Sequence, residues 1–159
     1  MNILALDPAT KCGWAHSCGA SGTWDLSVRR DESAGMRLIR FRGKLEEIRN
    51  GTGIDLIVYE AARNAGPRMQ GALVVHAELQ GTLKLFCEQA NLDYRGYSPV
   101  EIKKFATGKG NANKEQMVEA LAERMGIPYI MEQNNEVDAV WLLLLAQEQY
   151  AHQDRGEAV

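Results

Sequence analysis

Short apolar runs separated by turn residues open the chain, as in a small antiparallel sheet. Residues 3–6 form an apolar run that ends at Asp7, and the proline that follows blocks further pairing with a neighbouring strand. Residues 13–17 and 21–27 have the pattern of two more short strands joined by a glycine-containing turn. Gly13 is expected to allow a tight turn back after the first strand. The pattern therefore predicts three antiparallel strands.

Helical spacing and two further strand patterns follow. Apolar residues at helical spacing predict a helix that begins after Ser33, which offers an N-cap. Residues 54–60 are typical of a second buried strand that also ends in an acid, Glu60, and residues 94–98 predict a short fifth strand. Further helices are expected over residues 69–90, 100–106, 114–125 and 134–151.

The helix that begins near residue 114 carries its own start signal. Asn113 is expected to be its N-cap, and Gln116 occupies the matching position of a capping box. The residues expected on its buried face are Val118, Leu121, Ala122 and Met125.

These elements predict an α/β fold: a mixed five-stranded sheet with three antiparallel N-terminal strands plus two parallel ones, flanked by helices. The 159 residues suffice for one domain, which we place at residues 1–152, with a polar, frayed tail at 153–159. No segment reaches the roughly 18 continuous apolar residues of a membrane span. No signal peptide precedes the first strand, so we expect a cytoplasmic protein without a membrane partner.

The three cysteines, Cys12, Cys18 and Cys87, are an odd number without the spacing of a metal site. They are expected to be free thiols in a reducing compartment. The alternative is a zinc site formed by Cys12, Cys18 and His16.

Three acids stand where strands end or helices begin. Asp7 and Glu60 each end an apolar strand, so two parallel neighbouring strands would bring them side by side, where two carboxylates need a shared proton or a cation. The alternative for Asp7 is a turn cap through Thr10. Asp138 borders the apolar stripe of the last helix, and Asn135 lies one turn earlier on the same side. The alternative for this pair is that Asn135 caps the helix and Asp138 only favours its dipole.

A cluster of carboxylates without histidine or cysteine suits a hard cation such as Mg²⁺ or Mn²⁺. Two such ions about 3.5–4 Å apart can activate a water molecule and stabilise the leaving oxygen in phosphodiester hydrolysis.

A basic segment supports a phosphate-containing substrate. Residues 94–114 contain five basic residues and one acid, a net charge of +4 in a chain whose net charge is −3. Glycines and lysines before a helix N-terminus can surround phosphates. The basic residues and loop glycines are Arg95, Lys103, Lys104, Lys109, Lys114, Gly108 and Gly110.

The helix expected over residues 69–90 is apolar on more than one side, because Val74 and Val75 lie off its main stripe. This pattern would fit a dimer interface. His76 lies on the stripe and is expected to be a hydrogen-bonded core or interface residue, the alternative being a ligand.

In the order and content of its motifs, the chain resembles the RuvC-type Holliday junction resolvases of the ribonuclease H-like superfamily. Four segments that together span nearly the whole chain carry the resemblance. They are residues 3–8 with Gly13, residues 57–60, residues 98–114 with their Ser-Pro, lysines and Gly-x-Gly, and residues 135–139.

The resemblance implies the fold of that superfamily and roles for individual residues. Asp7, Glu60 and Asp138 would bind the metal ions, and Lys103 and Lys114 would contact the scissile or neighbouring phosphates. Lys104, Lys109, Gly108 and Gly110 complete the implied DNA-binding set. The family also forms homodimers through the helix after the Glu60 strand, here residues 69–90.

Two positions depart from the family pattern. Asn135 stands where the family has a fourth acid; we favour it as a weaker metal ligand, with Asn134 or Glu136 as possible substitutes. The loop that opens the junction in the family lacks a large apolar wedge here, so Arg63 and Arg68 are expected to contact phosphates instead.

The leading hypothesis is a Mg²⁺- or Mn²⁺-dependent, homodimeric endonuclease from a bacterium or a phage that resolves four-way DNA junctions in recombination and repair. Alternatives are a broader nuclease on flaps and forks, or a non-catalytic junction-binding module. A phosphotransferase of the actin-like class would need a second such domain, for which this chain has no room.

Overall fold

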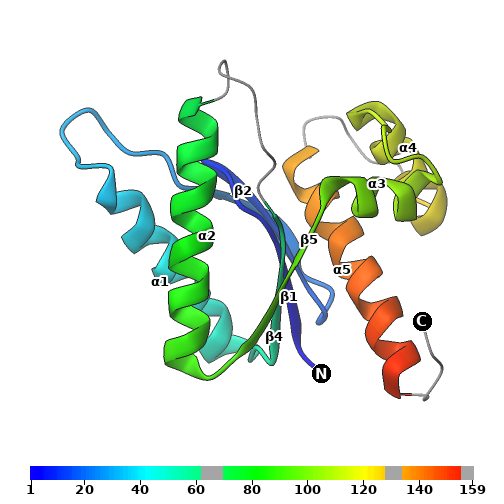
Figure 1. Cartoon of the computed structure of the whole chain (residues 1–159), viewed down its shortest axis with the longest axis horizontal. Coiled ribbons are helices and arrows are strands. Elements are labelled where there is room, and N and C mark those ends of the chain that lie inside the picture. Colours follow the sequence, from blue (N-terminus) through cyan, green and yellow to red (C-terminus); the bar gives the residue numbers. More distant parts are fainter. Residues whose placement is uncertain (62–69, 128–133, 155–159) are drawn as a thin grey trace.

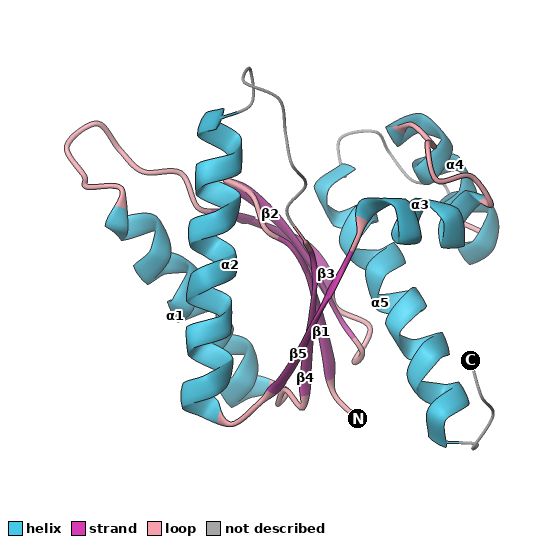
Figure 2. Ribbon diagram, viewed as in Figure 1, coloured by secondary structure: helices cyan, strands magenta, loops and turns pink. Residues whose placement is uncertain are grey.

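The computed structural model describes residues 1–61, 70–127 and 134–154, without the side chains of residues 134 and 152–154. Helices cover both faces of a single twisted sheet (Figure 1, Figure 2). Helices α1 (Gly35–Gly51) and α2 (Gln70–Ala90) lie on one face. The other face is covered by α5 (Asn134–Asp154), with α3 (Pro99–Thr107) and α4 (Lys114–Met125) packed outside it.

The sheet has five strands in the order β3-β2-β1-β4-β5. The strands are β1 (Ile3–Asp7), β2 (Lys11–His16), β3 (Ser21–Asp25), β4 (Leu56–Glu60) and β5 (Asp93–Tyr97). The first three pair antiparallel, whereas β4 and β5 add parallel to β1. The predicted mixed sheet of three antiparallel and two parallel strands is therefore confirmed.

The side chains of the central strands lie alternately in two hydrophobic cores, because successive residues of a strand point to opposite faces of the sheet. Ile3 and Ala5 of β1 belong to the core shared with α3, α4 and α5. Leu4 and Leu6 belong to the core shared with α1 and α2. Burial on both faces explains why β1 and β4 are almost continuously apolar rather than alternating.

Local side chains fix the start of two helices. Asn113 and Gln116 form the predicted capping box of α4. Ser98 and Glu101 form a second capping box at α3, with Pro99 in its first turn, although the sequence pattern indicated only the proline. The prediction that Ser33 caps α1 is wrong: the N-cap is Ala34, and no side chain bonds to the free N–H groups there.

Met125 was expected on the buried face of α4 but is 49% exposed in the last turn of the helix. On α5, Val137, Val140, Trp141 and Leu145 are buried, as are Leu142 and Leu143, while Leu144 is partly buried. The helix is covered on several sides because it lies between the sheet and α3 and α4.

None of the helices in the described part of the chain is long and apolar enough to cross a membrane.

Candidate active site

Asp7 and Glu60 lie side by side at one edge of the sheet. β1 and β4 are parallel, and their register pairs Leu6 with Tyr59, so the next residue of each strand is an acid. The strand alternation directs both carboxylates to the face covered by α5, since Ala5 and Val58, two residues earlier, belong to that core. The predicted juxtaposition of the two strand-ending acids is present in the backbone.

Helix α5 approaches this edge very closely at Gly13. Gly13 pairs with Asp7 across β1 and β2, and a Cβ at its position would lie 1.6 Å from the carbonyl oxygen of Asn135. The expectation that Gly13 forms a tight turn is wrong, because the residue lies within β2. Its missing side chain instead lets the first turn of α5 contact the strand beside Asp7.

A hydrogen bond fixes the same turn of α5 from the other side. The Ser21 hydroxyl at the start of β3 donates to Oε1 of Glu136 at 2.5 Å. Glu136 therefore points across β2 toward β3, while Asp138, two residues later on the helix, points elsewhere. This contact does not favour Glu136 as a substitute for the missing fourth acid.

Asp7 and Asp138 form the electrostatic centre of the site. Burial, with the negative charge of Asp138, raises the pKa of Asp7 from 3.8 to about 7, while Lys114 acts in the opposite direction. Burial also raises the pKa of Asp138, against the opposing effect of Lys114 and Lys103. The tertiary fold thus brings together two acids that are 131 positions apart in the sequence. Neither the turn-cap interpretation of Asp7 nor the helix-dipole interpretation of Asp138 explains why the two acids lie close together.

Two lysines face the acid pair from the α3–α4 unit. Lys114 is the first residue of α4, where the Asn113 capping box fixes the direction in which the helix starts. Lys103 is partly buried on α3, and its charge acts on Asp138. The charges of Lys103 and Lys114, the two lysines that the family resemblance implies for the site, therefore act on the acids.

The loop between α3 and α4 has a fixed backbone. Gly108 ends α3 with a φ of 78°, a left-handed conformation that favours glycine. A Cβ at Gly110 would lie 2.7 Å from Cγ1 of Val100, so this glycine lets the loop pack on α3. Lys104 and Lys109 are exposed beside it. No ion pair holds either lysine within the described residues, which leaves both available to an anionic ligand.

The backbone of Glu60 is held on both sides. Glu60 pairs with Tyr97 of β5, and Nε2 of His76 on α2 donates to the Glu60 carbonyl oxygen at 2.9 Å. Burial lowers the pKa of His76. The hydrogen bond expected of His76 is confirmed by this contact.

A ready three-residue metal site is absent from the described residues: no three His, Cys, Asp or Glu side chains converge there on one point. The acids that act on each other are Asp7 and Asp138, and Glu60 adjoins them through the β1–β4 register. Two carboxylates whose ionisation is mutually unfavourable fit a hard divalent cation, which removes the repulsion. The chemistry of this acid pair is thus suited to Mg²⁺ or Mn²⁺.

The zinc alternative is wrong for the described residues. His16 is buried and uses both ring nitrogens: Nε2 donates to the Gly53 carbonyl at 3.0 Å, and Nδ1 accepts from the Cys18 N–H at 3.1 Å. Cys12 faces the α1–α2 core. All three cysteines are free, as expected.

Two predicted DNA-binding residues, Arg63 and Arg68, lie outside the described residues. Helix α2, which follows them, exposes Val74 and Leu85 to 54% and 56%.

The fold resembles solved structures of junction-resolving enzymes, although no protein-family model matches the sequence. One is a Thermus thermophilus RuvC structure, with 17% identity over 89% of this chain and 92% of that chain and a TM-score of 0.64. Another is T. thermophilus RuvC in complex with a Holliday junction substrate, with 16% identity, coverage of 89% and 90%, and a TM-score of 0.68. The yeast mitochondrial Holliday junction resolvase Ydc2 matches with 12% identity, coverage of 88% and 75%, and a TM-score of 0.59. These similarities confirm the predicted ribonuclease H-like fold.

Proposed function

We propose that the protein is a structure-specific endonuclease that resolves four-way DNA junctions by metal-dependent hydrolysis of phosphodiester bonds. The observation that carries the proposal is the pairing of Asp7 with Asp138 beside Lys103 and Lys114. This pair lies at the strand ends of a fold shared with resolvases, one of them solved with a Holliday junction substrate. Residues 1–152 serve as one nuclease domain in this proposal, with residues 153–159 as a tail.

In this proposal Asp7, Glu60 and Asp138 bind the metal, and the Asn135 amide oxygen is a weaker fourth ligand. Two Mg²⁺ ions, or Mn²⁺ in their place, would supply the Lewis acidity that activates water and stabilises the leaving oxygen. To bind the cation, Asp7 must be a carboxylate, so it must give up the proton that it holds below its raised pKa of about 7. The neutral amide of Asn135 lowers the total negative charge and hence the affinity for the cation.

The lysines orient the DNA in the proposed site. Lys114 and Lys103 lie close enough to act on the acids, so they bind the phosphate that is attacked or its neighbour. Lys104 and Lys109, together with the backbone at Gly108 and Gly110, contact the strand further along. We assign Arg63 and Arg68 to the same strand on the basis of the sequence.

We propose a homodimer formed through α2, so that two sites cut symmetric strands of the junction. The exposed Val74 and Leu85 lie on α2 and supply an apolar surface for this contact. We place the enzyme in the cytoplasm of a bacterium or of a phage-infected host, where its three free thiols remain reduced.

The proposal is tested by cleavage of a labelled immobile junction, compared with linear duplex and a replication fork, in Mg²⁺, Mn²⁺ or EDTA. Metal-dependent paired nicks across the junction, with intact duplex, are expected. Asp138→Asn should reduce the rate about 10³-fold or more while junction binding remains. Asp93→Asn is the matched control, because Asp93 is exposed at the start of β5, on the opposite edge of the sheet.

Other outcomes identify the alternatives. Equal cutting of forks would indicate a broader branched-DNA nuclease. Tight junction binding without cleavage in either metal would indicate a non-catalytic binding module. Wild-type cleavage rates for Asp138→Asn would show that the assigned metal site is wrong.

A further inference from the structure

The connection between β3 and α1, residues 26–34, leaves the sheet at the same edge as the carboxylates. β3 is antiparallel to β2, which is antiparallel to β1, so β3 and β1 run in the same direction. The Leu26 N–H donates to the Thr10 carbonyl at 2.8 Å, three residues beyond Asp7. The connection, here called the arginine arm, extends past the sheet on the side of α1 and α2 (Figure 1). It lies on the side of the sheet opposite α3 and α4.

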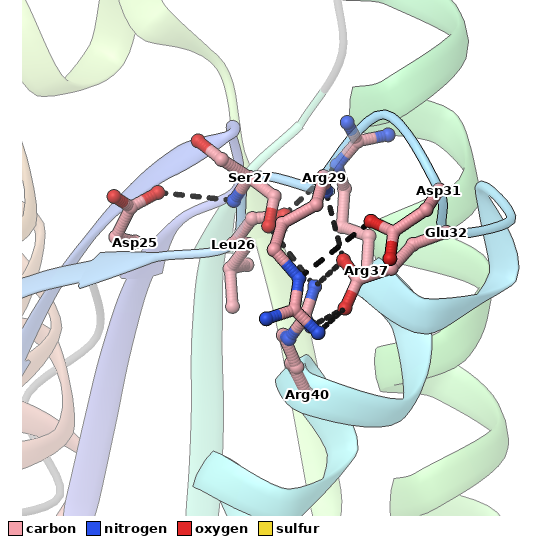
Figure 3. A network of polar contacts seen from close by, with 8 residues as sticks. All are labelled: Asp25, Leu26, Ser27, Arg29, Asp31, Glu32, Arg37 and Arg40. Atoms are coloured by element: carbon pink, nitrogen blue, oxygen red, sulfur yellow. Dashed lines mark hydrogen bonds and ion pairs between the residues drawn. The ribbon is translucent and has the colours of Figure 1, made fainter.

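Glu32 anchors the arginine arm to α1 (Figure 3). Its side chain is only 10% exposed, and both guanidinium Nη atoms of Arg40 donate to its carboxylate. The same carboxylate accepts the backbone N–H of Arg29 at 2.8 Å. The Arg40 bonds hold the pKa of Glu32 at about 2, so the anchor stays ionised across the physiological range.

Two more bonds attach the arm at its base. Arg40 Nη1 donates to the Ser27 carbonyl at 3.0 Å, and Arg37 Nε donates to the Leu26 carbonyl at 3.2 Å. Arg37 and Arg40 are therefore used within the protein to hold the backbone of the arm. A segment held in this way is pre-organised, so less entropy is lost when it contacts a ligand.

The arm presents the remaining arginines outward. The Arg29 side chain is 76% exposed and contacts Glu32 at 3.2 Å and Asp31 at 3.8 Å. Arg30 is exposed and makes no ion pair with any described residue. Asp25, the nearest acid on β3, is paired with Lys11 at 2.5 Å. Arg30 is thus the cation of the arm whose charge remains available.

We propose that the arginine arm is a second DNA-backbone contact of the enzyme, in which Arg30 binds a phosphate of the duplex arm that flanks the cleaved strand. The inference rests on the proposed function and adds a contact to it. Lysines approach the acids from α3 and α4 on one face of the sheet, and the arm that carries Arg30 leaves the same edge on the side of the other face. DNA lying across this edge therefore meets cations on both sides of the carboxylates.

The spacing places this phosphate away from the scissile one. Neighbouring strands are about 4.8 Å apart, so β3, two strands from β1, lies about 10 Å from Asp7, and Arg30 is five residues further along. Arg30 therefore contributes to binding and not to the chemical step. Its removal should weaken binding at every sequence equally, because phosphates carry no base identity.

Arg30→Gln tests the proposal through the salt dependence of junction binding, measured in EDTA so that no DNA is cut. Each phosphate neutralised by a cation contributes about 0.9 to the slope of log K against log salt concentration. Arg30→Gln should lower that slope by about 1 and weaken binding several-fold at moderate salt. The turnover of bound junction at saturating protein should stay at the wild-type value.

Arg49→Gln is the matched control. Arg49 is exposed in the last turn of α1, about 20 Å along the helix from the arm, and its nearest acid is Glu46 at 3.7 Å. It should keep the wild-type slope, and both variants should unfold at the wild-type temperature. If Arg30→Gln keeps the wild-type slope while the wild-type protein binds the junction normally, the proposed DNA contact of the arginine arm is wrong and the proposed function stands. If the wild-type protein does not bind branched DNA, both the proposed contact and the proposed function are wrong.

Discussion

The two faces of the sheet differ in side-chain size where α5 crosses β1 and β2. Toward α1 and α2, the central strands present large groups such as Leu4, Leu6 and Trp14. Toward α5, the residues at matching positions are small: Ala5, Gly13 and Ala15. Large side chains keep the helices of one layer apart from the strands, whereas small ones let α5 touch the backbone of β2.

Both faces hold a hydrophobic core, but only the α5 face also holds the candidate site. The α1–α2 face contains stacked and edge-on aromatic rings. The ring centroids of Trp14 and Trp24 lie 5.6 Å apart, and those of Trp24 and Phe41 lie 6.2 Å apart. The α5 face contains the carboxylates and the helix that positions Asp138. Changes on the first face should alter the free energy of unfolding, and changes on the second should alter catalysis.

Phe41→Ala should produce the largest change in stability. Phe41 is fully buried between α1 and the sheet. Its removal should lower the free energy of unfolding by about 3–5 kcal/mol, measured by urea denaturation. The junction-cleavage rate per folded molecule at low temperature should remain within about twofold of wild type, since no contact of Phe41 reaches the α5 face. Loss of cleavage in protein that is still folded would break the proposed separation of the two faces.

Gly13→Ala should have a smaller effect on stability and a larger one on catalysis. The new Cβ would meet the Asn135 carbonyl at 1.6 Å, so the start of α5 must move and take Asp138 with it. We expect the free energy of unfolding to fall by about 1–3 kcal/mol and the cleavage rate to fall about 10²-fold.

Gly43→Ala on α1 is the control for this substitution. No atom lies within 4 Å of a Cβ at Gly43, and its φ is not left-handed. The change should stabilise the protein by up to about 1 kcal/mol, because alanine favours helix, and cleavage should be unaffected. Equal behaviour of the two variants would contradict the role given to Gly13.

A further difference between the two faces is expected in pH dependence, measured as unfolding in EDTA. The pKa of Asp7 is about 7 in the folded protein and 3.8 ordinarily, so its ionisation destabilises the fold as the pH rises from about 4 to 7. Asp7→Asn should remove this loss and raise stability by up to about 4 kcal/mol at pH 8.

Glu32 on the α1 side should respond in the opposite direction. Its pKa is lowered from 4.5 to about 2, so its stabilising effect is present above pH 4.5 and is lost as the pH falls toward 2. Glu32→Gln should therefore flatten the acid limb of the stability curve and leave the Asp7 limb unchanged. If the stability of Asp7→Asn follows the wild-type curve at high pH, the ionised form of Asp7 is not disfavoured by its surroundings.

The sequence predicts the features that depend on local pattern. Both buried strands, their terminal acids and the capping box of Asn113 follow from residues close together in the chain. The juxtaposition of Asp7 and Glu60 followed from the sequence only if their two strands pair in parallel, because two other strands and a helix lie between them in the chain. The approach of Asp138 was expected from its place at the border of the α5 stripe and from the family resemblance.

Long-range contacts account for what the sequence did not predict. The role of Gly13 depends on a carbonyl 122 residues away, and the bond between Ser21 and Glu136 spans 115 residues. No local pattern distinguishes a glycine that allows close approach from one that allows a turn. The anchoring of the arginine arm by Glu32 was likewise not predicted, because Glu32 and Arg40 are eight positions apart and no local pattern pairs them.

The direction of β1 and α5 has a practical consequence for attaching the protein to a surface. β1 begins at the edge of the sheet opposite Asp7, and α5 starts beside Gly13 and runs for 21 residues, about 30 Å, away from it (Figure 1). Residue 1 and the last turn of α5 therefore both lie remote from the DNA-facing edge. A label or a tether at either point should leave that edge open, so single molecules could be immobilised in a known orientation while junctions arrive from solution.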